Sequence, residues 1–323
     1  MRCLTLSAEL TSRGHDVALL TGPIEIDWLR EAVLAAGVAV YECAFDSLPR
    51  EPIRDFAPDW VIVDSYRIPA ALVSEVARHA PLLAIIDGDD RGIDASLYLD
   101  QNLGAESRHR SAITADRVLA GSQFALVRRR VIEAMRPEPW RIHPPRPRVL
   151  CFMGGTDATG SVVGVAAAVA ALDRPLELTV VAAAPHHPAI ERAVSDRARL
   201  HLVLPTPELP ELLADADIVV SAAGTSAWDI CTLGIPAVFV GVVDNQRESL
   251  RELVARGLAF GVDTTDSTSG GLEQVGIDVG ALLDDDDLRE RLSRRSRAEF
   301  DGRGATRVAE RLERERVGAL LEW

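Results

Sequence analysis

The stretch VVSAAGTSAWDICTLGIPAVFV (219–240) contains the pattern that decides the fold. It begins with an apolar run of strand length, passes through a turn of small residues into a helical pattern, and ends with a second apolar run. Gly234 and Pro236 stand where the helix must stop, because glycine suits the left-handed helix end and proline cannot continue a helix. Strands that are apolar on both faces are typical of parallel sheets. The stretch therefore predicts a strand, a helix and a second parallel strand in succession.

The same alternation extends in both directions along the chain. Apolar runs predict strands at 17–20, 60–64, 82–87, 117–121, 148–155, 176–182, 217–224 and 237–241. Helical patterns predict a first helix that ends at Gly14, and further helices at 69–79, 122–135, 160–172, 225–233 and 245–256. The expected fold class is α/β, with doubly wound, Rossmann-like parallel sheets.

One proline-rich stretch, MRPEPWRIHPPRPR (135–148), interrupts this rhythm. Its five prolines prevent both a helix and a central strand and make a stiff connector. We therefore expect two domains, 1–140 and 148–323, separated by a cleft. The final helix, at about 304–321, is expected to cross back onto the first domain. Two such domains with an interdomain cleft form the GT-B arrangement of nucleotide-sugar enzymes.

Composition excludes several classes of function. The net charge of −14 disfavours a nucleic-acid surface, which needs clustered basic side chains. All 35 basic residues are Arg, so lysine Schiff-base chemistry and a Walker A lysine are excluded. Four scattered cysteines without a CxxC pair fit a cytoplasmic protein. No apolar run reaches the ~20 residues of a membrane span. The acidic run 284–287 and the pair His186–His187 lack metal-ligand spacing, so we expect no metal and no cofactor.

Three strand ends in the second domain carry small or polar residues suited to a nucleotide. The loop CFMGGTDATG (151–160) combines two glycines with a helix start, a geometry that presents backbone N–H groups to phosphate. An ordinary glycine-rich turn is the alternative for that loop alone. The turn 221–226 precedes a helix that Thr225 or Ser226 can cap, and Asp229 lies where a carboxylate could reach a ribose. A third polar helix start, DNQRE (244–248), follows the next strand. Together the three turns favour a nucleotide ligand.

In the first domain, Asp64 and Asp87 each end a strand. Such carboxylates serve either as helix caps or as acceptors for sugar hydroxyls, and the sequence leaves both alternatives open.

Six motifs then carry a resemblance over nearly the whole chain: MRCLTLS, LDQNLG, GSQFALVR, FMGGTD, AAGTSAWD and DNQRES, in this order. The chain resembles the UDP-sugar hydrolases of the pseudaminic acid pathway and the related spore-coat polysaccharide proteins. The resemblance implies a fold similar to the MurG-type glycosyltransferases. It also implies release of UDP from a UDP-linked diacetamido-trideoxyhexose by attack of water at the anomeric carbon, without a metal.

The resemblance also assigns residues to the ligand. Gly154, Gly155 and Thr156 would face the diphosphate, and Ser221, Gly224, Thr225, Asn245 and Gln246 would hold the nucleotide. Asp229 stands where the family usually has Glu, and its shorter side chain reaches less far toward the ribose. In the first domain Tyr66 matches a tyrosine of the sugar pocket. Arg2, Asp64 and Asp87 complete the expected substrate-binding set.

The family motif around Arg2 reads roughly G-x-G-H-x-x-R-C, and the resemblance places its catalytic His ahead of Met1. We therefore assign no catalytic residue within the chain, because His15 lies at the opposite end of the first helix. Two explanations compete. Either codons upstream of Met1 encode a strand and the G-x-G-H motif, or the chain is a homologue that binds without catalysis. A glycosyltransferase that passes the sugar from UDP to an acceptor alcohol is a further alternative.

Overall fold

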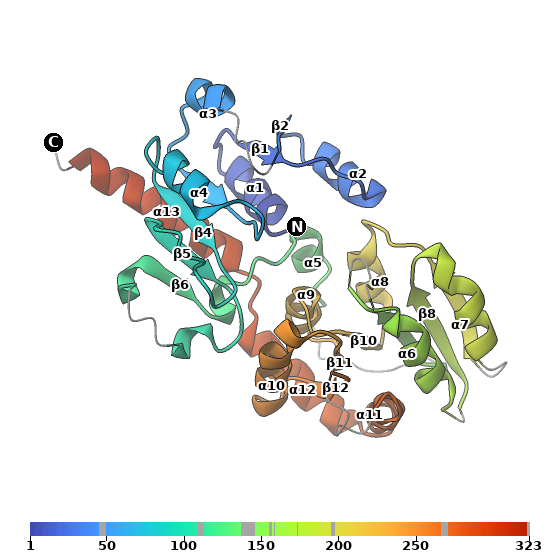
Figure 1. The fold of residues 1–323 in the computed structure, drawn as a ribbon. Coiled ribbons are helices and arrows are strands. Elements are labelled where there is room, and N and C mark those ends of the chain that lie inside the picture. Colours follow the sequence, from blue (N-terminus) through green and yellow to red (C-terminus); the bar gives the residue numbers. More distant parts are fainter. Residues whose placement is uncertain are drawn as a thin grey trace. The chain divides into compact units, whose positions relative to one another are not determined.

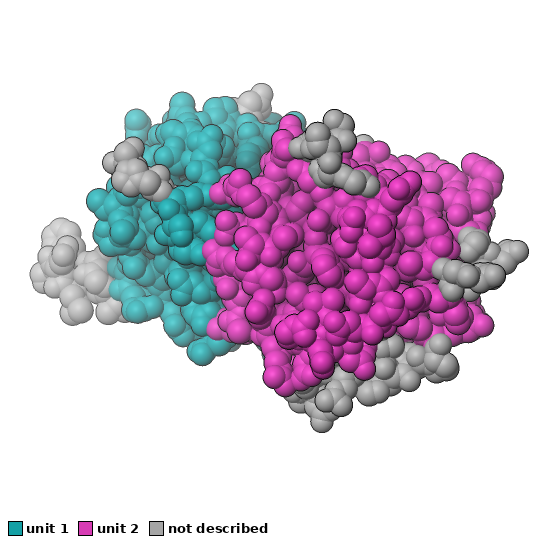
Figure 2. Space-filling view, turned by 90° about the horizontal axis from the view of Figure 1, so that it is seen from below, with its two compact units in different colours: residues 1–129, 302–323 teal, residues 130–301 magenta. Residues whose placement is uncertain are grey.

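A computed structural model describes all residues except 45–49, 109–112, 137–145, 155, 156, 158, 173, 195–197, 266–270, 322 and 323. The chain forms two compact units (Figure 2). Unit 1 comprises residues 1–129 and 302–323, and unit 2 comprises residues 130–301. Within the described residues, no helix is both long and apolar enough to cross a bilayer.

Unit 2 is built on a six-stranded parallel sheet with the order β12-β11-β10-β7-β8-β9. Its strands are β7 (Arg148–Phe152), β8 (Leu176–Val181), β9 (Ala198–Val203), β10 (Ile218–Ala222), β11 (Ala237–Gly241) and β12 (Phe260–Asp263). Its helices are α5 (Arg129–Glu133, whose first residue belongs to unit 1), α6 (Ser161–Ala170), α7 (His187–Ala193), α8 (Leu209–Asp215), α9 (Ser226–Leu233), α10 (Arg247–Ala255), α11 (Glu273–Asp284) and α12 (Asp286–Glu299). Two short 3-10 helices are η4 (Ala184–His186) and η5 (Asp244–Gln246).

Helices cover both faces of this sheet, as its wholly buried central strands require. Side chains of α6, α7 and α11, among them Val162, Ile190 and Val279, pack with the strands in one apolar cluster. Helices α8, α9 and α10 contact β7, β10 and β11 respectively. The chain builds β7, β8 and β9 in one direction and then returns to the other side of β7 to form β10. The junction of β7 and β10 is therefore the topological switch point of the sheet.

Unit 1 contains a four-stranded parallel sheet and a separate parallel pair (Figure 1). The sheet has the order β3-β4-β5-β6, with β3 (Val61–Val63), β4 (Leu82–Ile85), β5 (Leu97–Asp100) and β6 (Val118–Ala120). The pair consists of β1 (Ala18–Thr21) and β2 (Ala39–Glu42). The helices are α1 (Arg2–Ser12), α2 (Asp27–Ala35), α3 (Arg50–Phe56), α4 (Ala70–Val76), α13 (Gly304–Leu321), η1 (Ala105–Ser107), η2 (Ala115–Arg117) and η3 (Ser122–Phe124).

The last helix, α13, completes the core of unit 1. Val308 and Leu312 lie in one apolar cluster with Leu6 of α1 and with Leu83 of β4. The Trp60 indole N–H donates to the Leu312 carbonyl at 3.2 Å. The chain therefore returns to unit 1 after it has built unit 2.

The expected α/β class and the two Rossmann-like units are confirmed, but several local expectations are wrong. The apolar runs of the sequence do not predict strands β2, β5, β9 and β12. The helix expected at 122–135 is broken into η3 and α5, because the Leu126 N–H donates to the buried Gln101 side chain at 2.8 Å and is lost to a helix. The expected boundary at 140–148 falls largely on residues outside those described, and unit 2 already begins at Arg130.

Candidate functional site

The three polar turns of unit 2 follow three adjacent strands. Because β11, β10 and β7 are neighbours and parallel, their carboxyl ends lie side by side at one edge of the sheet. The turns after β7 and β10 also flank the switch point, where open α/β sheets bind ligands. The structure thus brings the nucleotide candidates of the sequence to one edge.

The amino end of α9 presents free backbone donors at this edge. Thr225 occupies the N-cap position but makes no side-chain cap, so the expected hydroxyl cap is wrong. In the described part of the chain, no acceptor is found for the N–H groups of Thr225 and Ser226. Free amides at a helix start favour an anionic group, because the helix dipole adds to their donor capacity.

Gln246 lies next to this helix start. A methyl group placed on Gly224 would be 3.8 Å from the Gln246 side-chain nitrogen. The Gln246 side-chain oxygen Oε1 accepts the Val242 N–H at 3.0 Å, which fixes the orientation of the side-chain amide. Its neighbour Asn245 is exposed in η5. Residues from two turns therefore adjoin one another, as the sequence predicts for a nucleotide site.

The turn after β7 differs from the expectation. Gly154 faces open space, with nothing within 4 Å of an added methyl group, whereas Gly155 and Thr156 lie outside the described residues. The Asp157 carboxylate accepts the N–H groups of Ser161 and Val162 at 3.1 and 3.2 Å. These two amides of α6 are therefore not free for a phosphate, and the expectation is wrong for them. Burial raises the pKa of the Asp157 carboxyl, and the two amides oppose that effect.

Two further nucleotide candidates, Ser221 and Asp229, are buried. Ser221 is fully buried at the end of β10, and Asp229 is 7% exposed in α9. Asp229 follows Trp228, whose ring stacks on Phe300 with the centroids 5.0 Å apart. Both side chains therefore offer little accessible surface to a ligand.

In unit 1, the predicted substrate residues converge at the carboxyl edge of the four-stranded sheet. Arg2, in the first turn of α1, binds Asp64 through Nε–Oδ2 at 3.1 Å and Nη2–Oδ1 at 2.5 Å. Its Nη1 donates to Asp87 Oδ1 at 2.8 Å. Tyr66 Oη donates to the other oxygen of Asp87. One guanidinium therefore joins carboxylates from two neighbouring strands, and the four predicted residues form one network.

Three residues that the sequence did not assign extend this network. Asn102 Nδ2 donates to Asp87 at 2.9 Å and to Asp100 at 3.0 Å. Arg108 Nη1 donates to the other oxygen of Asp100, which is wholly buried, at 2.8 Å. The signal that could have found Asp100 and Asn102 is the run LDQN (99–102), which places an acid and an amide at the end of a buried strand.

The network shifts the pKa values of its members. Burial would lower the pKa of Arg2, but the hydrogen bonds and charges of Asp64 and Asp87 outweigh it and raise that pKa. Burial would raise the pKa of Asp87, but Arg2, Tyr66 and Asn102 outweigh it and lower that pKa. Burial and the hydrogen bond to Asp87 together raise the pKa of Tyr66 to about 12. At neutral pH the network therefore holds charged Asp87 and Arg2 beside a neutral Tyr66.

The exposed side of this network suits a polyhydroxyl ligand. Tyr66 is 69% exposed although Asp87 holds its hydroxyl, and the Arg91 guanidinium lies 5.1 Å from the centre of the ring. A carboxylate oxygen accepts more than one hydrogen bond, so Asp64 and Asp87 keep capacity for hydroxyl donors. A fixed, exposed aromatic ring offers an apolar face beside them. In the described residues, no group of His, Cys, Asp and Glu is arranged to hold a metal.

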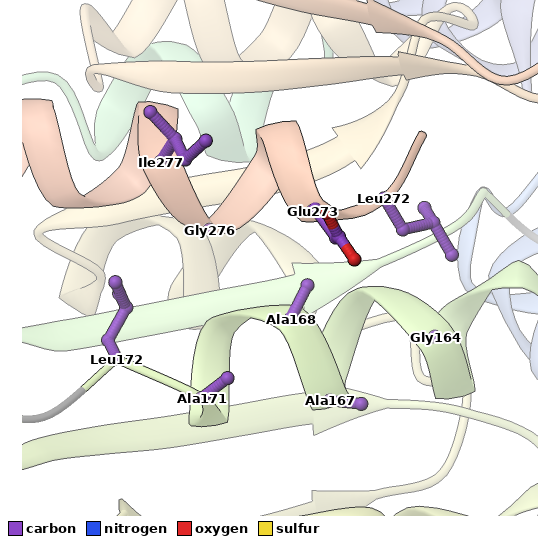
Figure 3. A pocket seen from close by; sticks show the side chains of 9 residues that line it. All are labelled: Gly164, Ala167, Ala168, Ala171, Leu172, Leu272, Glu273, Gly276 and Ile277. Atoms are coloured by element: carbon purple, nitrogen blue, oxygen red, sulfur yellow. The ribbon is translucent and has the colours of Figure 1, made fainter. Parts of the chain in front are cut away.

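A pocket of about 470 Å³ lies elsewhere in unit 2, between α6 and α11 (Figure 3). Its walls are small or apolar residues, such as Gly164, Leu272 and Ile277, with Glu273 as the single charged side chain. The two helices approach closely here, because a methyl group on Gly276 would meet the Ala168 carbonyl oxygen at 2.8 Å. The lining lacks the polar groups that a nucleotide needs.

Comparison with known proteins agrees with this architecture. Residues 188–302 match the family model for the glycosyltransferase family 28 C-terminal domain. The spore coat polysaccharide biosynthesis protein SpsG of Bacillus subtilis (strain 168) is 20% identical over 257 residues, which are 77% of this chain and 75% of SpsG.

Solved structures share the fold at low sequence identity. MurG of Acinetobacter baumannii superposes with a TM-score of 0.67 and 14% identity, over 97% of this chain and 95% of MurG. The Streptomyces sp. SF2575 glycosyltransferase SsfS6, solved with thymidine diphosphate, has a TM-score of 0.56 and 15% identity, over 93% and 92% of the chains. The chain therefore has the two-domain, Rossmann-like GT-B fold, and part of its unit 2 matches the C-terminal domain of glycosyltransferase family 28.

Proposed function

We propose that the protein binds a UDP-sugar and transfers the sugar from UDP to an acceptor in polysaccharide biosynthesis. The observation that carries the proposal is the placement of three polar turns on the adjacent strands β7, β10 and β11, next to the switch point of unit 2. The family 28 match covers two of these turns, those after β10 and β11. The similarity to SpsG supports a role in polysaccharide biosynthesis.

In this proposal the amino end of α9 binds the diphosphate. The free N–H groups of Thr225 and Ser226 supply donors for a phosphate oxygen, and Gly224 leaves room for its close approach. Gln246 and Asn245 supply amide groups to the nucleoside from the neighbouring turn. Gly154, Gly155 and Thr156 would add phosphate contacts in this proposal, whereas Ser221 and Asp229 are buried.

In this proposal, the network of unit 1 binds the hydroxyl groups of the sugar. Asp64 and Asp87 accept hydrogen bonds from hydroxyl groups, and Arg2 holds both carboxylates in place. Tyr66 contributes a ring face whose position Asp87 holds. These groups recognise a sugar without a metal ion.

Hydrolysis is the second candidate. The ordered motifs LDQNLG, FMGGTD and DNQRES favour it, because they resemble the UDP-sugar hydrolases. The two candidates differ only in the acceptor of the sugar, which is water in one and an alcohol in the other. Release of free sugar and its dependence on added acceptor alcohols separate them.

Binding of UDP tests the nucleotide site directly. We expect isothermal titration to show UDP binding that Asn245→Ala weakens by about fivefold, since one hydrogen bond contributes about 1 kcal/mol. Glu191→Ala, an exposed change on α7, is the matched control and should leave binding unchanged. Equal affinity for UDP and citrate would refute a nucleotide site. UDP binding without turnover of any UDP-sugar would favour a protein that binds without catalysis.

A further inference from the structure

The Arg91 guanidinium lies against the network of unit 1 but takes no part in its ion pairs. Arg2 is paired with two carboxylates, and Arg108 is paired with the buried Asp100. Across the residues that the structure describes, the Arg91 side chain has neither an acidic partner nor a hydrogen-bond acceptor, and its Nε is buried without one. Such a donor needs an explanation, because nearly all buried donors in proteins are satisfied.

The two acids before Arg91 are directed at the backbone and not at its side chain. Asp89 Oδ1 accepts the Arg91 N–H at 2.9 Å, and Asp90 Oδ1 accepts the Gly92 N–H at 2.8 Å. Such side chains form local turns with the backbone two residues further on. The turn holds Arg91 at φ +55°, in the left-handed region. Glycine would adopt this conformation without strain, so the fold accepts strain at a position where it gains a guanidinium.

Tyr66 sets the position of this guanidinium. The Arg91 Cζ lies 5.1 Å from the centre of the Tyr66 ring, within the range of a cation–π contact. The ring is itself held, because its hydroxyl donates to Asp87. A cation–π contact uses the charge of a guanidinium but none of its five N–H donors. Arg91 is only half-buried, so its remaining donors are placed at the surface of the network without a protein acceptor.

The ligand group that fits Arg91 best is a carboxylate. A guanidinium presents parallel N–H donors that match two oxygens of a carboxylate or of a phosphate. The surroundings favour the carboxylate, because Asp87, Asp89 and Asp90 are close in the chain and Asp87 shares Arg2 with a second acid. Their repulsion acts almost twice as strongly on a phosphate monoester as on a single carboxylate. Water screens the exposed Asp89, whereas the pair with Arg91 is a direct contact.

We infer that unit 1 binds a sugar acid, whose carboxylate pairs with Arg91 while Asp64 and Asp87 accept hydrogen bonds from its hydroxyl groups. The hydroxyl contacts rest on the proposed function, and the carboxylate adds a charge requirement to it. The carboxylate belongs either to the sugar of the UDP-sugar or to the acceptor, and the guanidinium chemistry is the same for both. A neutral sugar, such as the diacetamido-trideoxyhexose of the hydrolase resemblance, leaves Arg91 without a partner.

Binding of glucuronate and glucose tests the inference without a nucleotide. The two sugars differ at one carbon, which carries a carboxylate in the first and an alcohol in the second. In NMR titrations of the whole chain, glucuronate should bind at least about tenfold more tightly than glucose, since a charge-assisted pair exceeds a neutral hydrogen bond. Arg91→Gln should remove this preference, and Arg91→Lys should keep only part of it, because lysine lacks the planar fork.

A matched control lies in the same unit. Arg78→Gln makes the same change at an exposed residue after α4 and should leave the preference intact. Arg91→Gln retains the backbone strain of the wild type and breaks no hydrogen bond of the side chain, so its thermal unfolding should stay within a few degrees of the wild type. The loss of preference is then a loss of ligand contact and not of folding.

UDP-glucuronate and UDP-glucose repeat the comparison with the nucleotide attached. A preference for UDP-glucuronate that requires Arg91 assigns the carboxylate to the donor, whereas a preference confined to free glucuronate assigns it to the acceptor. UDP alone should bind the Arg91 variants as it binds the wild type. Absence of UDP binding would refute the nucleotide site and leave the result with free sugars standing. Equal binding of acid and alcohol in both pairs, or a preference that survives Arg91→Gln, would overturn the inference.

Discussion

At the scale of single residues, Arg2 has the most demanding position, because one guanidinium is paired with two carboxylates. Its side chain is 12% exposed, and those of Asp64 and Asp87 are 17% and 27% exposed. Arg2→Met should lower the free energy of unfolding by about 3 kcal/mol, since it leaves two adjacent carboxylates without a cationic partner in a poorly hydrated place. Denaturant unfolding measures this loss. Arg30→Met, which removes an exposed pair with Asp27, is the control and should cost under about 1 kcal/mol.

Lysine at position 2 refines this prediction. Arg2→Lys keeps the charge but loses the planar fork, so it should recover only part of the stability. Equal losses for the Met variants at positions 2 and 30 would contradict the role given to the network.

Tyr66 gives the same network a signature in pH. Its pKa of about 12 lies above the ~10 of an unfolded tyrosine. Its hydrogen bond to Asp87 therefore contributes fully below pH ~10, and that contribution is lost as the pH rises through 12. Absorbance titration should show the same tyrosinate signal up to pH ~11 in the wild type and in Tyr66→Phe. A signal that is a third smaller in the variant would contradict this, because the chain has 3 tyrosines.

At the scale of elements, two glycines end helices with the same backbone conformation but in different surroundings. Gly14 after α1 and Gly234 after α9 both adopt positive φ, at +88° and +71°. A methyl group on Gly14 meets nothing within 4 Å, whereas on Gly234 it would lie 2.5 Å from Arg297 Nε and 2.8 Å from Ser293 Oγ. Gly14→Ala should cost about 1 kcal/mol of backbone strain, and Gly234→Ala clearly more, since its neighbours must also move. Thermal and denaturant unfolding of the two variants measure the difference, and equal costs would contradict it.

At the scale of the whole molecule, unit 1 is assembled from both ends of the sequence. Removal of 302–323 uncovers Leu6 and Leu83, which Val308 and Leu312 cover in the intact chain. We expect the amides of β4 and β5 to exchange at least about tenfold faster after this truncation, while those of β7 and β10 stay protected. Exchange mass spectrometry on peptides from both units measures this. Equal loss of protection in both units would contradict their separate cores.

The sequence predicts the elements that their own residues determine. Strands β7, β10 and β11 follow from continuous apolar runs, because central parallel strands are buried on both faces. Strand β2 has no such signal, since all its residues are exposed at a sheet border. The break between η3 and α5 depends on Gln101, which lies 25 residues away in the sequence. Local periodicity contains no information about that contact.

The same division applies to the candidate site. Asp64 and Asp87 were found because each follows an apolar run, and parallel strands bring such ends together. The bond between Arg2 and both carboxylates is set by the packing of α1, which no local pattern specifies. Asp157 likewise binds the amides of α6 that its own loop was expected to offer to a ligand. Its carboxylate lies in the same glycine-rich turn, and only the folded geometry shows which group it binds.

The return of α13 to unit 1 sets an order of events during synthesis. The ribosome delivers residues 1–129 first, but Val308 and Leu312 come last, after the whole of unit 2. At about 5–20 residues per second, the apolar face of the β3–β6 sheet stays uncovered for roughly 10 to 40 s. The last residue of unit 2 is synthesised before the final segment of unit 1, residues 302–323, although residues 1–129 leave the ribosome first. The nascent chain therefore carries an exposed apolar surface in the residues made first, and only the finished chain can cover that surface.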